Sequence, residues 1–329
     1  MANLVCVATI WIANVVCIGW AWLVYVVCIA WVFIVHYTCI GIAWIVYWVC
    51  RSPEAFFNLL LRIRLRALVL RQCLRPKDTP RNPLERAGWR LTFEDDFTSG
   101  VIDTSKWSDR PYYGTRYLDI GLASGITPTQ YFDPASFAFG SSTVKLLAEK
   151  KNTSLQDPLY PYNNGWFTIP FSVGYLGWTS PSQDQQFGYF EIRCKIPGAP
   201  DMWPAFWLVS RQSWPPEIDI FEFYTKSSTK KFESTQHWGS EPNHPKQTRK
   251  HRVCSPSVHF HVYACEWTPT RIRWYYDNVL IRVATNGISD FIYPMHVVVN
   301  AGVDARSGHN PMSSTFPNAF EVDYVRAYA

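Results

Sequence analysis

The first fifty residues of this 329-residue chain contain no Asp, Glu, Lys or Arg, and apart from cysteines and tyrosines their one ionisable side chain is His36. The stretch also lacks the basic start and short apolar region of a secretory signal peptide, so it fits that class poorly. Its length exceeds the roughly 20 residues that a helix needs to cross a bilayer. Residues 1–50 therefore predict one long tilted transmembrane helix, or two spans joined by a tight turn.

The same fifty residues repeat with a period of eleven, marked by Cys6, Cys17, Cys28, Cys39 and Cys50. On a helix this spacing is close to three turns, so the cysteines would line one slowly drifting stripe. A tandem DNA repeat, translated from a start codon placed too far upstream, would give the same pattern. Both interpretations stay open. The first predicts a membrane-anchored protein and the second a secreted one.

Residues 51–88 carry nine Lys or Arg against three acids, a balance of +6. Five of the arginines lie among Leu, Ile and Val between residues 62 and 75, with no acid between them. Anionic lipids attract juxtamembrane segments of this kind. The positive-inside rule would place the segment in the cytoplasm. Pro76, Pro80 and Pro83 then predict a stiff linker.

Residues 89–329 lack a strong net charge, because the +5 of the whole chain less the +6 of residues 51–88 leaves about −1. This balance excludes the clustered basic face of a nucleic-acid-binding protein. Ten of the sixteen tryptophans lie here, among many Tyr, Phe, Gly and Pro. Such an aromatic-rich and turn-rich composition is typical of an all-β sandwich.

Cysteine is also scarce in residues 89–329, where only Cys194, Cys254 and Cys265 occur. Three is an odd number, so at most one disulfide can form within this part of the chain. A bond between Cys254 and Cys265 is conceivable. A small buried apolar side chain is the default expectation for each of the three.

The segment WPPEIDIFEFY, residues 214–224, places three acids on one predicted strand. Pro216 cannot lie inside a central strand, so the strand should begin near Glu217. Alternation then puts Glu217 and Asp219 on one face. Glu222 reaches the same face only if the chain bulges by one residue between Asp219 and Glu222. We therefore expect a β-bulge at this place.

Three carboxylates on one strand face suit glycoside hydrolysis, in which one acid attacks the anomeric carbon and another protonates the departing oxygen. Crowded like charges separate the pKa values of such groups. We assign Glu217 as the nucleophile and Glu222 as the general acid/base, with Asp219 hydrogen-bonded to the nucleophile. The alternatives are a solvated acidic face and a site for Ca²⁺ or Mg²⁺.

The segment EIDIFE resembles the E-x-D-x-x-E signature of glycoside hydrolase family 16, in the bulged form of its laminarinase group. Segments from LTFEDDFTSG to FEVDYVRAY resemble further strands of that family, in the same order. The resemblance covers residues 89–329 and implies a concanavalin-like β-jelly-roll sandwich with a concave glycan cleft. It also implies an endo-acting, retaining hydrolase of β-1,3- or β-1,3(4)-glucan.

Aromatic platforms and a few polar groups line clefts for neutral glycans. The resemblance implies that Trp214 stacks on substrate and that His237 lies near the catalytic acids. Trp203 and Asn300 are further candidates for the cleft, although core packing is as reasonable for Trp203. The family pattern also implies a structural Ca²⁺ bound by Glu94 and Asp323, and no cofactor for catalysis.

Three other functions stay open for the same sandwich: a catalytically inert β-glucan-binding module, a transglycosylase, and a hydrolase of a red-algal galactan such as agar or carrageenan. Binding modules lose the catalytic glutamates, whereas this chain has all three acids. Lys226, Lys230 and Lys231 would favour an acidic glycan. We expect a monomer that binds a polysaccharide and a membrane but no nucleic acid, with its catalytic domain outside the cytoplasm.

Overall fold

The computed structural model describes residues 53–117, 128–226, 228–240, 244–304, 311 and 314–329, together with helical pieces of residues 19–42. The chain forms two compact units, Met1–Leu60 and Leu61–Ala329. Among the described residues, no helix combines the length and the hydropathy that crossing a bilayer requires. The predicted transmembrane spans fall largely on residues 1–18 and 43–52, which lie outside the described residues.

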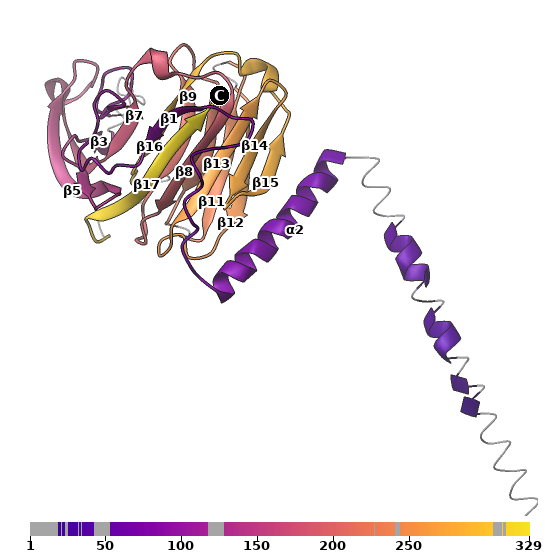
Figure 1. Cartoon of the computed structure of the whole chain (residues 1–329). Coiled ribbons are helices and arrows are strands. Elements are labelled where there is room, and N and C mark those ends of the chain that lie inside the picture. Colours follow the sequence, from indigo (N-terminus) through magenta and orange to yellow (C-terminus); the bar gives the residue numbers. More distant parts are fainter. Residues whose placement is uncertain are drawn as a thin grey trace, which may run out of the picture. The chain divides into compact units, whose positions relative to one another are not determined.

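The second unit contains two β-sheets that form a sandwich (Figure 1). In the larger sheet, hydrogen-bonded neighbours follow the order β15 (Val279–Ala284), β14 (Arg271–Tyr276), β13 (His261–Thr268), β8 (Gly188–Lys195), β17 (Asn318–Tyr328), β5 (Val144–Gln156), β6 (Trp166–Val173) and β3 (Gln130–Phe132). Two short strands extend it, β1 (Leu91–Asp95) beside β17 and β4 (Phe137–Phe139) beside β5. All of its pairs are antiparallel except β3 with β6.

The smaller sheet carries the three acids predicted to be catalytic. Its strands follow the order β12 (Lys246–Arg252), β11 (Lys231–His237), β10 (Glu217–Phe223), β9 (Ala205–Ser210), β16 (Met295–Asn300), β7 (Tyr175–Trp178) and β2 (Trp107–Ser108). Short 3₁₀ turns occur at η2 (Asn163–Gly165), η3 (Pro181–Gln183) and η4 (Ile288–Asp290). The prediction of an all-β sandwich is confirmed.

The core lies between the two sheets and follows from alternation along their strands. On β10, Ile218, Phe221 and Phe223 are fully buried, and on β8 Phe190 and Ile192 join the same apolar cluster. Ile220 belongs to this cluster too, so the positions of β10 left for the opposite face are those of Glu217, Asp219 and Glu222. Each Å² of apolar surface that the side chains of the cluster bury stabilises the fold by about 25 cal/mol, and this burial fixes the position of β10 in the sheet.

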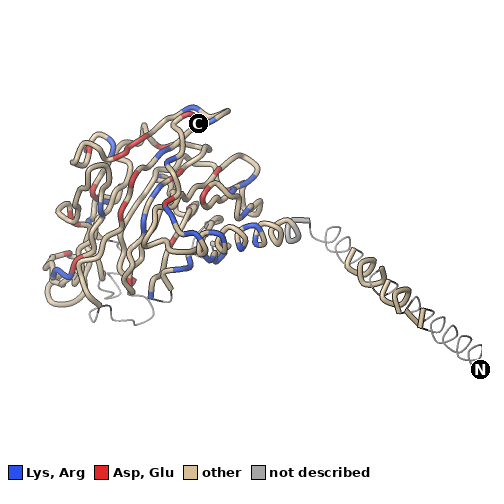
Figure 2. Tube along the Cα trace, turned by 60° about the horizontal axis from the view of Figure 1, so that its bottom comes forward, with Lys and Arg blue, Asp and Glu red and all other residues tan. Residues whose placement is uncertain are grey.

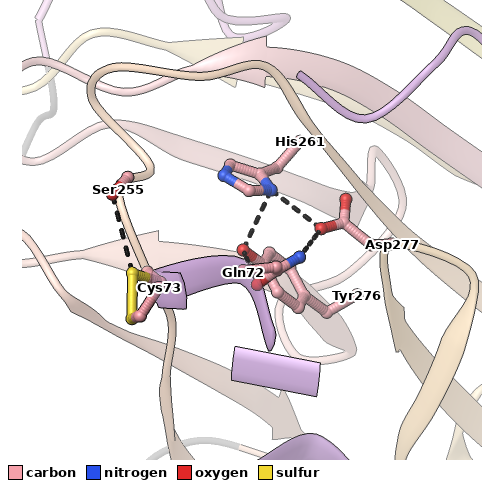
Figure 3. Close-up of a disulfide and its surroundings, with 7 residues drawn as sticks. Gln72, Cys73, Ser255, His261, Tyr276 and Asp277 are labelled. Atoms are coloured by element: carbon pink, nitrogen blue, oxygen red, sulfur yellow. Dashed lines mark hydrogen bonds and ion pairs between the residues drawn. A yellow bond between two sulfur atoms is a disulfide. The ribbon is translucent and has the colours of Figure 1, made fainter. Parts of the chain in front are cut away.

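Helix α2 (Pro53–Leu74) ends against the sandwich, and the described part of the second unit includes its last fourteen residues. Leu61 and Leu65 are buried, and Leu68 and Val69 pack against the core. A disulfide joins Cys73 to Cys254, so the partner of Cys254 comes from the basic segment and not from Cys265 (Figure 3).

The segment that follows α2 also belongs to the sandwich. The backbone N–H of Thr79 donates to the carbonyl of Phe260 at 2.8 Å, and the Asn82 amide donates to Glu191 at 2.8 Å. The compact unit thus begins at Leu61, before the predicted boundary at residue 89. As expected, the two other cysteines of the domain are buried thiols.

Candidate active site

A bulge in β10 brings the three acids to one face of the smaller sheet. Across β11, Asp219 pairs with Thr235 and Glu222 pairs with Glu233. Between these two pairs β10 advances by three residues while β11 advances by two, so β10 holds one extra residue. The register of β10 with β9 shifts at the same place. The predicted β-bulge is confirmed, and it re-aims Glu222 to the side of the other two acids.

The bulge is supported from the larger sheet. The indole Nε1 of Trp274, on β14, donates a hydrogen bond of 3.0 Å to the backbone carbonyl of Asp219. This carbonyl stands where the ladder is interrupted, and an unpaired buried carbonyl would be costly. Trp274 therefore supplies a hydrogen bond to a backbone carbonyl that the bulge would otherwise leave without a partner.

Two aromatic side chains contact Glu217. The indole Nε1 of Trp214 donates to Glu217 Oε2 at 3.0 Å. His237, directly opposite Glu217 on β11, places its Nε2 3.5 Å from an oxygen of Glu217 and 3.5 Å from one of Asp219. Trp214 is 41% exposed, so part of its ring stays open to a ligand.

Glu222 has its own pair of aromatic donors. The Trp203 indole Nε1 donates to Glu222 Oε1 at 3.0 Å, and the Tyr224 hydroxyl donates to the same oxygen at 2.6 Å. The two rings stack with centroids 5.5 Å apart. Oε1 of Glu222 is therefore held by two donors, which fixes the orientation of the carboxyl group.

Burial and mutual repulsion shift the titration of the site. Burial and, after it, the charge of Asp219 raise the pKa of Glu217 to about 8, although His237 and the Trp214 hydrogen bond act to lower it. Burial and the charge of Glu222 raise the pKa of Asp219 well above its ordinary value. Burial lowers the pKa of His237. The site therefore retains protons at a pH where free carboxyls would have lost them.

The raised pKa of Glu217 predicts a pH-dependent cost in stability. Between about 4.5 and about 8, the folded chain keeps a proton on Glu217 that the unfolded chain releases, so the stability of the protein falls as pH rises. Glu217→Gln cannot titrate, and its free energy of unfolding should exceed that of the parent by an amount that grows across this window. The growth is at most about 1.4 kcal/mol per pH unit. Urea unfolding of both proteins at several pH values tests this, and a difference independent of pH contradicts it.

The structure places all four residues predicted to bind substrate around the acids or next to them. Trp203, Trp214 and His237 contact the acids directly. Asn300 is linked to the acids through Trp207. Its Oδ1 accepts a hydrogen bond of 2.8 Å from the Trp207 indole, and Trp207 on β9 is the backbone pairing partner of Asp219 on β10.

Two neighbours of the acids were not predicted. Tyr224 lies two residues after Glu222, and this spacing puts both side chains on one face of a strand, a signal available from the sequence. His244 meets the Trp214 ring edge to face, with ring centroids 4.5 Å apart. It comes from the connection between β11 and β12, where no sequence pattern indicates it.

The predicted calcium ligands do not form a metal site. Asp323 accepts hydrogen bonds from Arg81 Nε at 2.8 Å and from Arg193 Nη1 at 2.6 Å. Glu94 accepts one from Arg326 Nε at 3.1 Å. Guanidinium groups occupy the oxygens that Ca²⁺ would need and supply its charge. These residues do not fit calcium, and the prediction is corrected to arginine–carboxylate ion pairs.

The described residues offer one other donor set for a cation, made by Glu217, Asp219 and His237, whose ligand atoms lie within 4.8 Å of one another. One imidazole and two carboxylates suit Zn²⁺. The same atoms include the proposed nucleophile, so a cation bound there would compete with glycoside chemistry.

A comparison with known families matches residues 159–325 to the model for glycosyl hydrolases family 16. The matched range includes all three acids and their aromatic neighbours. It extends from the connection before β6 into β17, so it covers most of both sheets.

Curated relatives and solved structures agree with this match. The Beta-glucanase of Rhodothermus marinus is 30% identical over 271 residues, which cover 73% of this chain and 85% of the relative. The Endo-1,3-1,4-beta-glycanase ExsH of Rhizobium meliloti is 29% identical over 260 residues, and this chain spans only 53% of its length. The catalytic domain of a laminarinase from Thermotoga petrophila has the same fold, with a TM-score of 0.59, 23% identity, and coverage of 73% of this chain and 98% of that one.

Proposed function

Because the chain belongs to glycosyl hydrolases family 16, we propose that it is an endo-acting, retaining hydrolase of β-1,3- or β-1,3(4)-linked glucan. The observation that carries this proposal is the bulge that gathers Glu217, Asp219 and Glu222 on one face of β10. The names of the β-glucanase and β-glycanase relatives support the choice of substrate.

In the proposed reaction, the carboxylate of Glu217 attacks the anomeric carbon while Glu222 gives a proton to the departing glycosidic oxygen. A glycosyl ester with Glu217 results. Glu222 then takes a proton from water, which attacks the same carbon and releases Glu217. Trp214 and His237 favour the ionised form of Glu217, and Asp219 shares a hydrogen bond with it. Each displacement inverts the anomeric centre, so the product keeps the β configuration.

Product analysis tests this proposal. Laminarin and mixed-linkage β-glucan should yield oligosaccharides, and NMR of the first product should show the β anomer. An α anomer would contradict the retaining mechanism. If no polysaccharide is cleaved although laminarin still binds, an inert binding module replaces the proposal.

Trp214→Phe tests the indole hydrogen bond while it keeps an aromatic ring. Loss of a donor to a charged group costs about 1.5–3 kcal/mol, so we expect kcat/KM to fall roughly 10- to 100-fold. The hydrogen bond lowers the pKa of Glu217, so the acid limb of the pH–rate profile should move to higher pH. Trp166→Phe is the matched control, since Trp166 is 47% exposed and lies on β6 of the other sheet. An unmoved acid limb would show that Trp214 does not tune Glu217.

Zinc should inhibit the enzyme, and a chelator should not. The donor set of Glu217, Asp219 and His237 would hold Zn²⁺ on the nucleophile. His237→Gln removes the imidazole ligand and should weaken the inhibition by Zn²⁺ about tenfold or more. Titration of initial rates with ZnCl₂ measures this. A loss of activity in EDTA that Zn²⁺ or Ca²⁺ restores would instead indicate a metal requirement.

A second candidate substrate is an acidic galactan such as carrageenan. Strand β12 carries four Lys or Arg residues in the sequence KQTRKHR, and the charge of Lys246 lowers the pKa of both Asp219 and His237. Its positive charge therefore reaches the acids. Cleavage of κ-carrageenan, without cleavage of laminarin or of the uncharged galactan agarose, would favour this substrate class over β-glucan.

We also propose that the second unit acts outside the cytoplasm. The Cys73–Cys254 disulfide supports this, because such bonds persist in oxidising compartments. It joins the end of the basic helix to the sandwich, so both belong on the same side of any membrane, against the topology that the positive-inside rule favours. Protease digestion of intact cells tests the proposal, and full protection of the domain would contradict it.

A further inference from the structure

Helix α2 has two opposite apolar faces, of which the sandwich covers only one. Leu61 and Leu65 face the core at 2% and 6% exposure. On the other side, Ile63, Leu70 and Leu74 are 54%, 62% and 73% exposed. The spacings of seven and four residues place these three on one stripe of the helix. An exposed stripe of large apolar side chains calls for an explanation.

Arginines border this stripe on both sides. At 100° per residue, Arg62 and Arg66 fall on one edge of it, and Arg64 and Arg71 fall on the other. All four are exposed, and no Asp or Glu occurs between residues 55 and 77. Figure 2 shows these basic residues along the helix beside the sandwich. We call Arg62, Ile63, Arg64, Arg66, Leu70, Arg71 and Leu74 the outer face of α2.

From this arrangement we propose that the outer face of α2 lies flat on an anionic phospholipid surface. An interfacial helix buries its apolar stripe at the boundary of headgroups and acyl chains. Long arginine side chains at the edges extend to the phosphates, each contributing about tenfold or less in affinity. The proposal concerns the surface of the membrane and does not depend on the glycosidase activity.

Two parts of the protein itself could also cover the outer face of α2: the same helix of a second copy, and residues 1–50 of the same chain. Charge argues for anionic lipid over both. A second copy of α2 would bring four arginines against four arginines, which repel one another. Residues 1–50 contain no acid to neutralise them. Of these three candidates, only an anionic lipid surface supplies both an apolar layer and negative charge.

The helix is held firmly enough to orient the sandwich on such a surface. The disulfide fixes its end at Cys73. Next to it, the Gln72 side chain donates to Asp277 and accepts from the Tyr276 hydroxyl at 3.2 Å (Figure 3). Docking of the outer face would therefore set the direction in which the acids of β10 open relative to the membrane.

Photocrosslinking in the full chain tests the proposal. The photoreactive residue p-benzoylphenylalanine replaces Leu70. The chain is then reconstituted in two kinds of vesicle, one of phosphatidylcholine alone and one of phosphatidylcholine with an equimolar amount of phosphatidylglycerol. We expect lipid adducts in the anionic vesicles, and at least about tenfold fewer in the zwitterionic ones. The combined variant R62Q/R64Q/R66Q/R71Q should show the same loss in anionic vesicles. The photoreactive residue at Leu159, which is 59% exposed on a loop beyond β5, is the control and should give no lipid adduct.

Three outcomes would overturn the proposal: a crosslink from position 70 to a second chain, a crosslink to residues 1–50, or lipid adducts that ignore both lipid charge and the four arginines. The Cys73–Cys254 disulfide serves as a check on folding. If neither cysteine is labelled by a thiol reagent, the bond is intact and the variant keeps α2 on the sandwich. Hydrolysis of soluble oligosaccharides by the arginine variant should stay within about twofold of the parent, because these four arginines lie on the side of α2 that faces away from the sandwich and its acids.

Discussion

Glu217→Gln is expected to lower kcat on laminarin by on the order of 10⁴-fold or more, since removal of a covalent nucleophile leaves only binding and electrostatic assistance. Gln keeps the size of the side chain and still accepts the Trp214 hydrogen bond. Glycan binding should therefore persist. Initial rates and calorimetric titration with laminarin oligosaccharides measure the two effects separately.

The matched control for this substitution is Glu321→Gln on β17 of the other sheet, where Glu321 is paired with Lys195 at 2.8 Å. Loss of a partly exposed ion pair costs about 1 kcal/mol or less of stability, and activity should be unchanged. Hydrolysis by Glu217→Gln at the parental rate would show that another residue is the nucleophile. Loss of both activity and binding would point to a folding defect instead.

Glu222→Gln should have the second-largest effect, a loss of about 10²- to 10⁴-fold on polysaccharide, because the leaving oxygen then departs without a proton. An aryl glucoside with an acidic phenol as leaving group needs no such proton, so formation of the glycosyl ester should be nearly normal. Its hydrolysis still needs a general base. A burst of phenol followed by slow turnover is therefore expected.

Stopped-flow release of the phenol measures this burst. Tyr224→Phe, which removes one of the two donors to Glu222 and keeps the carboxyl group, is the comparison variant and should lose only about tenfold. Equal losses on polysaccharide and on the aryl glucoside, without a burst, would contradict the role of Glu222 as general acid/base.

The part of the site that the period of a strand predicts lies on β10, whereas the positions of Trp214 and His237 are implied by the family resemblance. The alternation of Ile218, Phe221 and Phe223 with Glu217 and Asp219 determines which side chains point into the apolar core. The same alternation requires a bulge before Glu222 and places Tyr224 beside it. Such inferences need only the period of a strand, and for this reason they agree with the structure.

Features that depend on distant segments could not be predicted in this way. Asp323 looked like a calcium ligand, because nothing near it in sequence indicates that Arg81 and Arg193 converge on it from 242 and 130 residues away. Cys254 lacked a partner for the same reason. The sequence predicts a juxtamembrane segment for residues 62–75, and the packing of Leu61 and Leu65 against the sandwich depends on strands far away in the chain.

The disulfide described above also has a mechanical consequence. Cys73 and Cys254 are 181 residues apart, so a pull between the N-terminal part of the chain and its C-terminal end passes through the sulfur atoms directly to the connection before β13. Strands β1 to β12 lie inside the closed covalent loop and carry none of that load in series. Strand β10 is thereby shielded from tension between the two ends of the chain, and the strands inside the loop cannot be pulled out one after another from the N-terminal side.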